Sequence, residues 1–149
     1  MVVTNLSRIP TARAIAATLG TLLIINIYAP SVTSKQAERK FFFHNGLPLL
    51  LGSPSDDILL VGDINCLLAA ADFTEHGCFR RSLATLIKGY ALRDTWQARP
   101  VRHEPTHHNI HGAIRIDRFY LLRDLMTRKP GIATVAAAFT DHMAVVLRL

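Results

Sequence analysis

The apolar positions of the chain fall into short runs separated by polar or turn-forming residues, which predicts alternating strands and helices. The runs 13–19 (RAIAATL) and 22–29 (LLIINIYA) flank a Gly-Thr pair and predict two strands joined by a tight turn. The run 58–64 (ILLVGDI) has strand length without alternation, which is typical of a strand buried on both faces.

Two segments favour helices instead. The segment 31–51 begins with Ser and Thr as cap candidates and continues with helix formers, and Leu47-Pro48 is expected to interrupt or restart this helix. The segment 78–92 carries apolar residues at helical spacing, which are Phe79, Leu83, Leu86 and Ile87.

The C-terminal third predicts further strands. The segment 95–112 is His-rich and predicts a loop, whereas 113–122 alternates, with Arg115 and Asp117 on one face of a strand and the apolar residues on the other. Two more apolar runs, 132–139 and 143–149, are separated by a short polar turn, TDH. With no internal repeat or low-complexity linker, the pattern predicts one α/β domain.

The uncharged stretch 14–34 has an alternative interpretation. It reaches the ~20 residues that a membrane helix needs, and Arg8 and Arg13 precede it as basic residues precede the apolar region of a signal peptide. Gly and Thr in its middle, and Asn, Tyr and Pro towards its end, favour two buried strands over a membrane or secretory segment.

The composition indicates a globular protein with a basic surface. The chain has 149 residues, half of them hydrophobic, and a formal net charge of +6. A basic surface favours an anionic partner such as nucleic acid, phosphate or acidic lipid. Cys66 and Cys78 fit neither a disulfide framework nor a Cys-x-x-Cys site, so we interpret both as reduced thiols of an intracellular protein.

Polar residues gather where predicted strands end. A period of two places Asp63 and Asn65 on the same side of an extended backbone. Asp117 lies within a strand, and Asp141-His142 lies in the turn between two strands. A lone Asp after a strand is more commonly a turn or capping residue, but a carboxylate inside an apolar strand must find a partner or its pKa rises.

Four short motifs occur in order: NIYAP (26–30), VGDINC (61–66), RIDRFYL (115–121) and TDH (140–142). Together they resemble the exonuclease–endonuclease–phosphatase superfamily, and most of all the apurinic-endonuclease-like domains of non-LTR retrotransposons. Those domains read N-x-Y-x-P, G-D-x-N, S-R-I-D-R and S-D-H. The stretches RSLATLIKGYALRDTW and PTHH…HGAIRIDR are also similar to the retroelement domains, so the likeness runs from about Arg13 to the last residue.

The resemblance implies a four-layered α/β sandwich, with two facing mixed sheets and helices outside. It also implies that residues 1–149 are a partial domain lacking the N-terminal third, because upstream motifs with an Asn and a metal-binding Glu have no counterpart: no Asp or Glu precedes Tyr28, and Glu38, on a predicted helix, is a poor substitute. Ile114 and Thr140 replace two family serines. Exposed sheet edges are therefore expected to make the chain marginally stable or self-associating.

The resemblance further implies Mg²⁺-dependent phosphodiester hydrolysis, with Mn²⁺ as the alternative ion. Asp63 corresponds to the Asp that lies near the metal and positions the nucleophilic water, and Asn65 to a neutral donor to the scissile phosphate. Tyr28 corresponds to a tyrosine whose hydroxyl reaches that phosphate.

The remaining site residues come from the C-terminal motifs. Asp141 corresponds to a carboxylate on the metal side. His142 corresponds to a His that contacts the phosphate and acts as acid or base, and Asp117 to the Asp that hydrogen-bonds this His and fixes its tautomer.

Three functional hypotheses follow. The chain derives from an endonuclease that nicks target DNA for retrotransposition, or it is a catalytically inactive remnant with residual DNA binding, or it is a phosphatase or phosphodiesterase of the same superfamily. DNA is the expected partner, no membrane is expected, and the parent element is expected to act inside the cell, in the nucleus. His103, His107, His108 and His111 form a cluster that favours a DNA-facing loop over a zinc site, and Trp96 is expected in the core.

Overall fold

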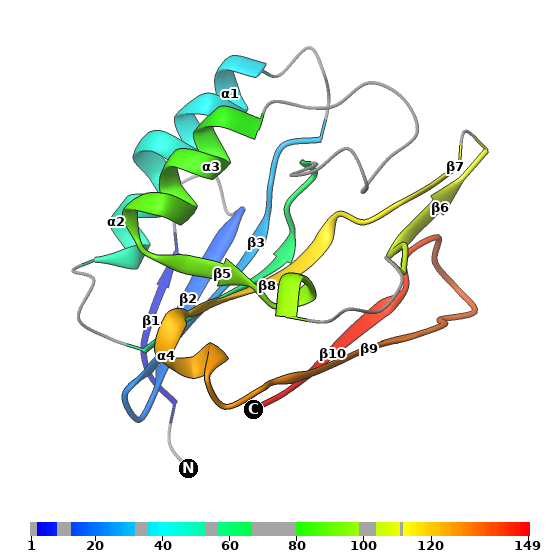
Figure 1. Ribbon diagram of the computed structural model, residues 1–149. Coiled ribbons are helices and arrows are strands. Elements are labelled where there is room, and N and C mark those ends of the chain that lie inside the picture. Colours follow the sequence, from blue (N-terminus) through cyan, green and yellow to red (C-terminus); the bar gives the residue numbers. More distant parts are fainter. Residues whose placement is uncertain are drawn as a thin grey trace.

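The computed structural model describes residues 3–8, 13–31, 36–52, 57–66, 80–98, 104–110 and 112–149. Its largest element is a six-stranded mixed sheet with the strand order β1-β2-β3-β4-β8-β5. Helices cover one face of this sheet, and a smaller two-stranded sheet lies on the other side (Figure 1). The α/β sandwich built from two sheets, as expected from the sequence, is confirmed.

The strands of the main sheet are β1 Val3–Arg8, β2 Ala14–Leu19, β3 Leu22–Tyr28, β4 Asp57–Asp63, β5 Leu92–Asp94 and β8 Asp117–Leu122. Neighbouring strands are antiparallel except β3 and β4, which run parallel from Leu22↔Asp57 to Tyr28↔Asp63. A parallel pair needs a long crossover connection, and the helices between β3 and β4 lie on that connection. The predicted strand pair around the Gly-Thr turn is confirmed as β2 and β3.

The helical layer contains three consecutive segments and one separate helix. The consecutive segments are α1 Gln36–Phe41, the π-helical η2 Phe42–Gly46 and α2 Leu47–Leu51. α2 begins at Leu47 directly after the π-helical segment, with Pro48 in its first turn. The helix type therefore changes at Leu47-Pro48, while the chain stays helical. The separate helix is α3 Arg80–Gly89. The cap candidates at 32–34, the turn at 53–56 and Phe79 lie outside the described residues.

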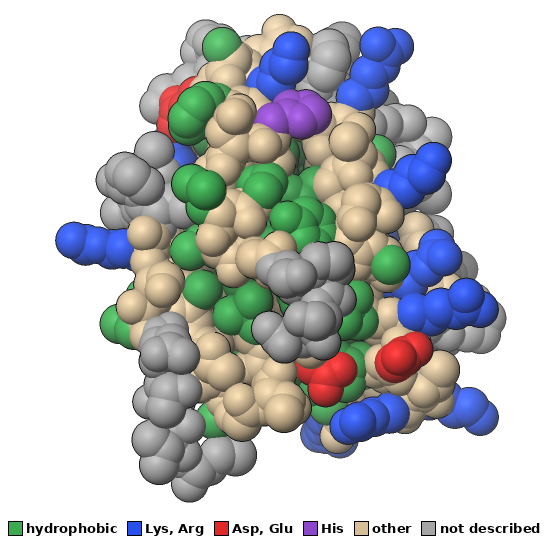
Figure 2. Space-filling model, turned by 90° about the vertical axis from the view of Figure 1, so that its left-hand side faces the viewer, with side chains coloured by type: hydrophobic (Ala, Val, Ile, Leu, Met, Phe, Trp, Pro, Cys, Tyr) green, Lys and Arg blue, Asp and Glu red, His purple; other side chains and the backbone are tan. Residues whose placement is uncertain are grey.

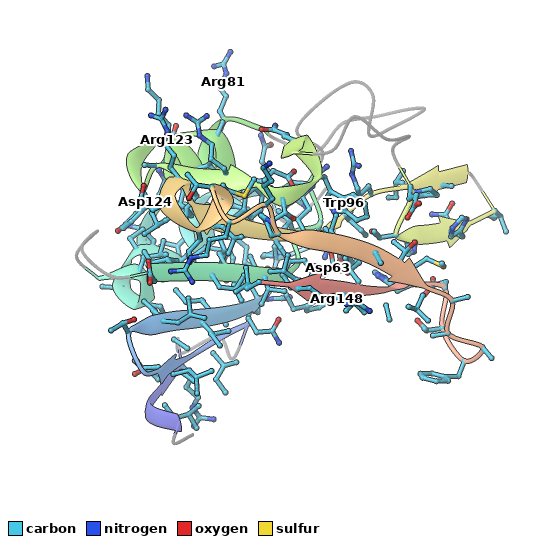
Figure 3. All side chains as sticks on the ribbon, turned by 60° about the horizontal axis from the view of Figure 1, so that its bottom comes forward. Asp63, Arg81, Trp96, Arg123, Asp124 and Arg148 are labelled. Atoms are coloured by element: carbon cyan, nitrogen blue, oxygen red, sulfur yellow. The ribbon has the colours of Figure 1, made fainter. Side chains whose placement is uncertain are left out.

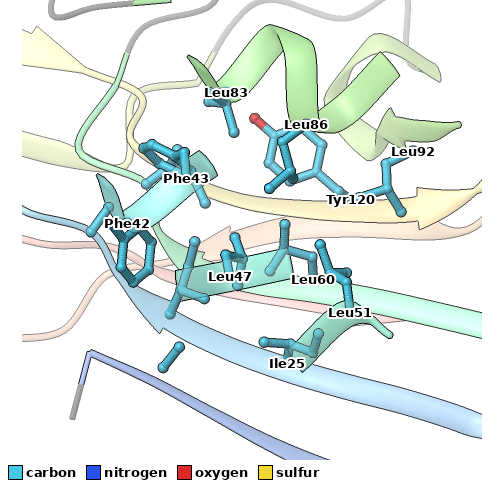
Figure 4. Close-up of a cluster of buried hydrophobic side chains, with 14 of the residues drawn as sticks. Ile25, Phe42, Phe43, Leu47, Leu51, Leu60, Leu83, Leu86, Leu92 and Tyr120 are labelled. Atoms are coloured by element: carbon cyan, nitrogen blue, oxygen red, sulfur yellow. The ribbon is translucent and has the colours of Figure 1, made fainter. Parts of the chain in front are cut away.

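The main core lies between this helical layer and the sheet (Figure 4). Its largest fully buried side chains include Ile25, Leu60 and Tyr120 from the sheet and Phe43, Leu47, Leu51 and Leu83 from the helices. A second cluster on the opposite face contains Leu59, Leu121 and Leu125. The neighbours Leu59 and Leu60 are thus both buried, on opposite faces, which confirms that β4 is covered on both sides.

The second sheet pairs β9 Gly131–Val135 with β10 Ala144–Arg148. The intervening residues 136–143 carry the TDH motif back towards the main sheet (Figure 1). A short helix, α4 Arg123–Met126, follows β8 and contributes to the second hydrophobic cluster. The two C-terminal strands predicted from the sequence are confirmed.

Two expectations for the His-rich region were wrong. The predicted loop 95–112 contains the 3-10 helix η4 Thr95–Ala98 and the strand β6 His107–Asn109, which pairs with β7 Gly112–Ile114. The predicted strand 113–122 is divided, because Arg115 and Ile116 leave the ladder between β7 and β8. Both side chains are buried there, whereas alternation would have exposed Arg115.

The described residues include no helix long and apolar enough to cross a membrane. The uncharged stretch that begins at Ala14 is occupied by β2 and β3 in its described part.

Candidate active site

Three of the predicted site residues lie in one row across the main sheet. The register pairs Tyr28 of β3 with Asp63 of β4, and Asp63 with Asp117 of β8. Side chains paired in register point to the same face of a sheet. The side chains therefore form a row across the ends of three neighbouring strands: Tyr28, Asp63 and Asp117. Tyr28, at the end of this row, is 54% exposed.

Gly62 explains the local backbone at the end of β4. It has φ +129°, and a Cβ atom built there would lie 2.0 Å from the carbonyl oxygen of Ile27 on the neighbouring strand. Only glycine adopts this conformation and tolerates this approach. The glycine of the G-D-x-N motif is thus a structural requirement for placing Asp63, and the sequence analysis had assigned it no role.

Asn65 reaches Asp63 through a turn and not along a strand. β4 ends at Asp63, and Asn65 has a left-handed backbone with φ +48°. Its backbone N–H donates to Asp63 Oδ1 at 2.8 Å, and its Nδ2 donates to Asp63 Oδ2 at 3.0 Å and to the Ala29 carbonyl at 2.8 Å. The amide therefore fixes the Asp63 carboxylate and ties it to the end of β3.

Asp117 is held at the start of β8 by contacts to its backbone. The hydroxyl of the buried Thr106 accepts the N–H groups of Ile116 and Asp117, at 3.1 and 3.0 Å. Trp96 Nε1 donates to the Asp117 carbonyl at 3.4 Å. Trp96 is only 6% exposed, so its predicted core position is confirmed. Figure 3 places Trp96 and Asp63 at the same end of the main sheet, away from Arg123 and Asp124 of α4.

His142 reaches the site from the loop between β9 and β10. Its Nδ1 lies 3.0 Å from Asp117 Oδ2, within hydrogen-bond distance. Because a carboxylate only accepts, the proton of a neutral His142 ring lies on Nδ1 and its Nε2 is free to accept. The hydroxyl of Thr140 accepts the backbone N–H of His142 at 3.1 Å, so this position uses its hydroxyl to shape the turn.

His107 joins the site through contacts that span the sequence. Its Nε2 lies 3.2 Å from Asp141 Oδ2, and its ring meets that of His142 edge-on at 4.7 Å between centroids. A backbone bridge pairs His107 with His142, and His108 N–H donates to the Asp141 carbonyl at 2.9 Å. The sequence places His107 in a cluster of histidines but carries no signal for its pairing with Asp141.

A buried ion pair joins β8 to β5, next to Asp117 in the sequence. Arg118 bonds Asp94 through Nη1, and both side chains are 2% exposed. Arg118 Nη2 also donates to the Arg115 carbonyl at 3.1 Å, and the guanidinium of Arg115 lies 5.0 Å from the Trp96 ring centroid. The structure buries both arginines, which flank Asp117 in the sequence.

The pKa values of the Asp63 and Asp141 carboxylates shift in opposite directions. Burial, and secondly the nearby Asp117 carboxylate, raise the pKa of Asp63 to about 6. The hydrogen bond from the Asn65 backbone and the nearby His142 and His107 act in the opposite direction and lower this pKa. The bond from its own backbone N–H, and secondly His107, lower the pKa of the exposed Asp141. Asp63 is thus a carboxylate that a nearby positive charge would stabilise.

Two neighbouring groups of side chains have ligand atoms within 4.8 Å of one another. Asp63, Asp117 and His142 form one group, and His107, Asp141 and His142 form the other. The first offers two carboxylates, the donors that hard cations such as Mg²⁺ prefer. The raised pKa of Asp63 also fits a site completed by a cation.

The structure brings together Asp63, Asn65, Asp117 and His142, with Asp141 on the far side of His142 and Tyr28 at the end of the row. Other candidates lie elsewhere. His108 is exposed, and Glu38 forms an ion pair with Arg13 at 3.0 Å, beside the Tyr28 ring. Cys66 is buried, and Cys78, His103 and His111 lie outside the described residues.

Solved structures with this fold are known. A variant of the 3' phosphatase NExo from Neisseria, bound to a product DNA hairpin, matches with a TM-score of 0.79 and 18% identity over 99% of this chain and 71% of that one. The 3'-5' exonuclease NExo from Neisseria meningitidis gives the same values. An AP endonuclease from Archaeoglobus fulgidus matches with a TM-score of 0.82 and 16% identity, over 97% and 70%. No protein-family model matches the chain, and no curated protein matches it in sequence.

Proposed function

We propose that this chain derives from a divalent-metal-dependent phosphodiester hydrolase acting on DNA, and specifically from the target-nicking endonuclease of a non-LTR retrotransposon. The observation that carries the proposal is the joining of Asp63, Asn65, Asp117 and His142 at one end of the sheet. The solved structures of the same fold include a 3' phosphatase bound to DNA, an exonuclease and an AP endonuclease, which supports DNA as the substrate. The four motifs favour the retroelement branch.

Each side chain has a role that its contacts support. Ionised Asp63 accepts a hydrogen bond from the attacking water and orients it. Asn65 keeps Asp63 in place, and its amide becomes a donor to the phosphate when it releases one of its two present acceptors. Tyr28, half exposed at the end of the row, contacts a phosphate oxygen through its hydroxyl.

His142 and Asp117 handle a proton. Asp117 holds the Nδ1 proton, so Nε2 faces outward as an acceptor from water, and as a donor once His142 is protonated. General acid–base groups of this kind contribute roughly 10²–10⁴-fold to rate.

The donor set suits Mg²⁺, with Mn²⁺ as the alternative. Asp63 and Asp141 are the residues that would hold the ion. When bound, the ion supplies Lewis-acid stabilisation of charge on the phosphate oxygens.

Nicking of supercoiled plasmid by the purified chain with Mg²⁺ tests the proposal. We expect nicking that His142→Ala lowers by about 10²–10⁴-fold, and that rises as pH passes 6, because Asp63 must be ionised. His44→Ala, an exposed histidine of the helical layer, is the matched control and should nick normally. Nicking that survives His142→Ala would refute the assigned site.

An inactive remnant that still binds DNA is the second candidate. No acidic residue precedes Tyr28, and Glu38 is engaged by Arg13, so these residues offer no free carboxylate beside Asp63. A folded chain that binds duplex DNA in a salt-dependent manner, but nicks none, would establish this reading. Release of phosphate from a 3'-phosphorylated hairpin without nicking would instead establish a phosphatase, the activity named for one solved structure.

We also propose that the isolated chain self-associates. β1 is an edge strand of the main sheet, and Leu6 on β1 and Leu49 on α2 are 71% and 77% exposed. Figure 2 shows apolar side chains in the middle of the face that lies to the left in Figure 1, bordered by Lys and Arg. Sedimentation should show oligomers that Leu6→Lys disperses, because a charge on an edge strand opposes pairing. A wild-type chain that sediments as a monomer would refute this.

The site of action follows from the substrate. An enzyme that nicks chromosomal DNA must reach the nucleus, so we propose that the parent element acts there. Imaging of a fluorescently tagged chain tests this, and exclusion from the nucleus would contradict it.

A further inference from the structure

The second ligand group differs in chemistry from the carboxylate pair. It offers two imidazoles and one carboxylate, all with ligand atoms within 4.8 Å of one another. Imidazole nitrogen suits borderline ions such as Zn²⁺, whereas Mg²⁺ is bound through oxygen. We propose that this group is a binding site for a Zn²⁺-like transition-metal ion, with His107, Asp141 and His142 as ligands.

The spacing of two of these ligand atoms already fits such an ion. A tetrahedral ion with ligands at about 2.0–2.1 Å separates them by about 3.4 Å. His107 Nε2 and Asp141 Oδ2 lie 3.2 Å apart. An ion replacing the proton shared between them would therefore need little movement of either side chain. A neutral His107 ring bound through Nε2 would carry its one proton on Nδ1, and a doubly protonated ring would release its second proton to solvent.

His142 is oriented for the third bond. Metal-binding histidines typically hold their second ring nitrogen on a carboxylate, which fixes the ring and raises its basicity. Asp117 does this at Nδ1 of His142, at 3.0 Å, and leaves Nε2 as the ligand. The His107 ring meets the His142 ring edge-on at 4.7 Å between centroids, and one ligand atom of each lies within 4.8 Å of the other.

The site is reachable and rigid. The Asp141 side chain is 61% exposed, so an ion has access, whereas His107 and His142 are 15% and 32% exposed. The backbone bridge between His107 and His142, and the bond from His108 N–H to the Asp141 carbonyl, fix the relative positions of the three residues. Three protein ligands leave a fourth position for water or an anion.

Binding of Co²⁺, a coloured substitute for Zn²⁺, tests the proposal without DNA. The tag-free chain should take up one equivalent of Co²⁺ with visible d–d absorption that Zn²⁺ abolishes and excess Mg²⁺ does not. His107→Phe, which preserves ring shape, and Asp141→Asn, at an exposed side chain, should each weaken binding more than about tenfold. His108→Phe, the exposed neighbour, is the matched control and should bind as wild type.

Three results of the Co²⁺ experiment would refute the proposed ion site. A wild-type chain without Co²⁺ absorption overturns it, and so do His107→Phe and Asp141→Asn chains that are folded and bind normally. Loss of binding in a His103→Asn/His111→Asn chain alone would assign the ion to the histidine cluster and also overturn the proposal. Thermal melts without metal show whether each variant folds.

The ion site shares Asp141 and His142 with the proposed hydrolytic site but does not include Asp63. Asp63→Asn should abolish Mg²⁺-dependent nicking yet keep Co²⁺ binding, so failure of one proposal is distinguishable from failure of the other. One consequence does rest on the proposed function: an ion on Asp141 and His142 removes two hydrolytic residues, so Zn²⁺ should inhibit nicking.

Discussion

Substitution of Gly62 by alanine should strongly destabilise the chain, because alanine fits neither its backbone conformation nor its surroundings. The new Cβ would lie 2.0 Å from the Ile27 carbonyl oxygen and 2.8 Å from Asn26 Oδ1, so the β3–β4 ladder must separate. The positive φ adds strain of ~1–3 kcal/mol, and overpacking against a strand adds ~1–3 kcal/mol. We expect Gly62→Ala to lower the free energy of unfolding by roughly 2–6 kcal/mol, a large share of the ~5–15 kcal/mol typical of a domain.

Urea unfolding followed by circular dichroism measures this loss, with Gly89→Ala as the control. Gly89 ends α3 with open space around its Cβ position and without a positive φ, so alanine there should be neutral or stabilise by up to ~1 kcal/mol. If Gly62→Ala were as stable as Gly89→Ala, the close approach of β4 to β3 would be wrong. The placement of Asp63, the next residue, would then lose its basis.

Three further results are expected. Because the pKa of Asp63 in the folded chain is raised to about 6, its ionisation opposes folding above pH 6 and not below pH 4. The free energy of unfolding of Asp63→Asn should therefore rise by about 1–2 kcal/mol relative to wild type between pH 4 and pH 8, a value reduced for the partial exposure of Asp63. A difference in urea unfolding that does not change with pH would contradict the shift. Arg118→Met leaves the buried Asp94 charge unpaired and should cost ~3–5 kcal/mol in the same assay; a cost below ~1 kcal/mol would mean that the pair is not buried. Thr106→Val keeps the side-chain shape but removes the acceptor of two backbone N–H groups, so it should lower the free energy of unfolding by ~1–3 kcal/mol. It should also lower nicking, because Asp117 is misplaced; full activity would refute that positioning role.

The apolar pattern predicted most of the strands because their burial leaves a local signal. The strands β2, β3, β4, β9 and β10 follow it closely, since unbroken or alternating apolar runs reflect the faces that they bury. The hairpin of β6 and β7 gave no such signal, because β6 reads His-His-Asn and its position comes from backbone pairing. The break at Arg115 is equally hidden, since it arises from bonds to Arg118 and Thr106.

For the candidate site too, one part was predictable from the sequence and the other was not. Asp63, Asn65 and His142 were found through motifs, but the period-two argument for the first two was incomplete, because the chain turns after Asp63. The contact between His107 and Asp141 joins residues 34 positions apart, one on β6 and the other in the loop between β9 and β10. A pattern read along the chain carries no information on such a contact, and only the packing of the sheets creates it.

The position of His142, in the loop between β9 and β10, has a consequence for heat inactivation. Asp63 and Asp117 belong to the well-packed main sheet, whereas His142 depends on the β9–β10 pair, in which only Ile132 is fully buried. Regions with few buried contacts open locally at a lower free energy than the whole domain unfolds. Detachment of β9–β10 would separate His142 from Asp117 while the six-stranded sheet stayed intact. Hydrolysis should therefore fade on warming before the far-ultraviolet signal changes, and return on cooling.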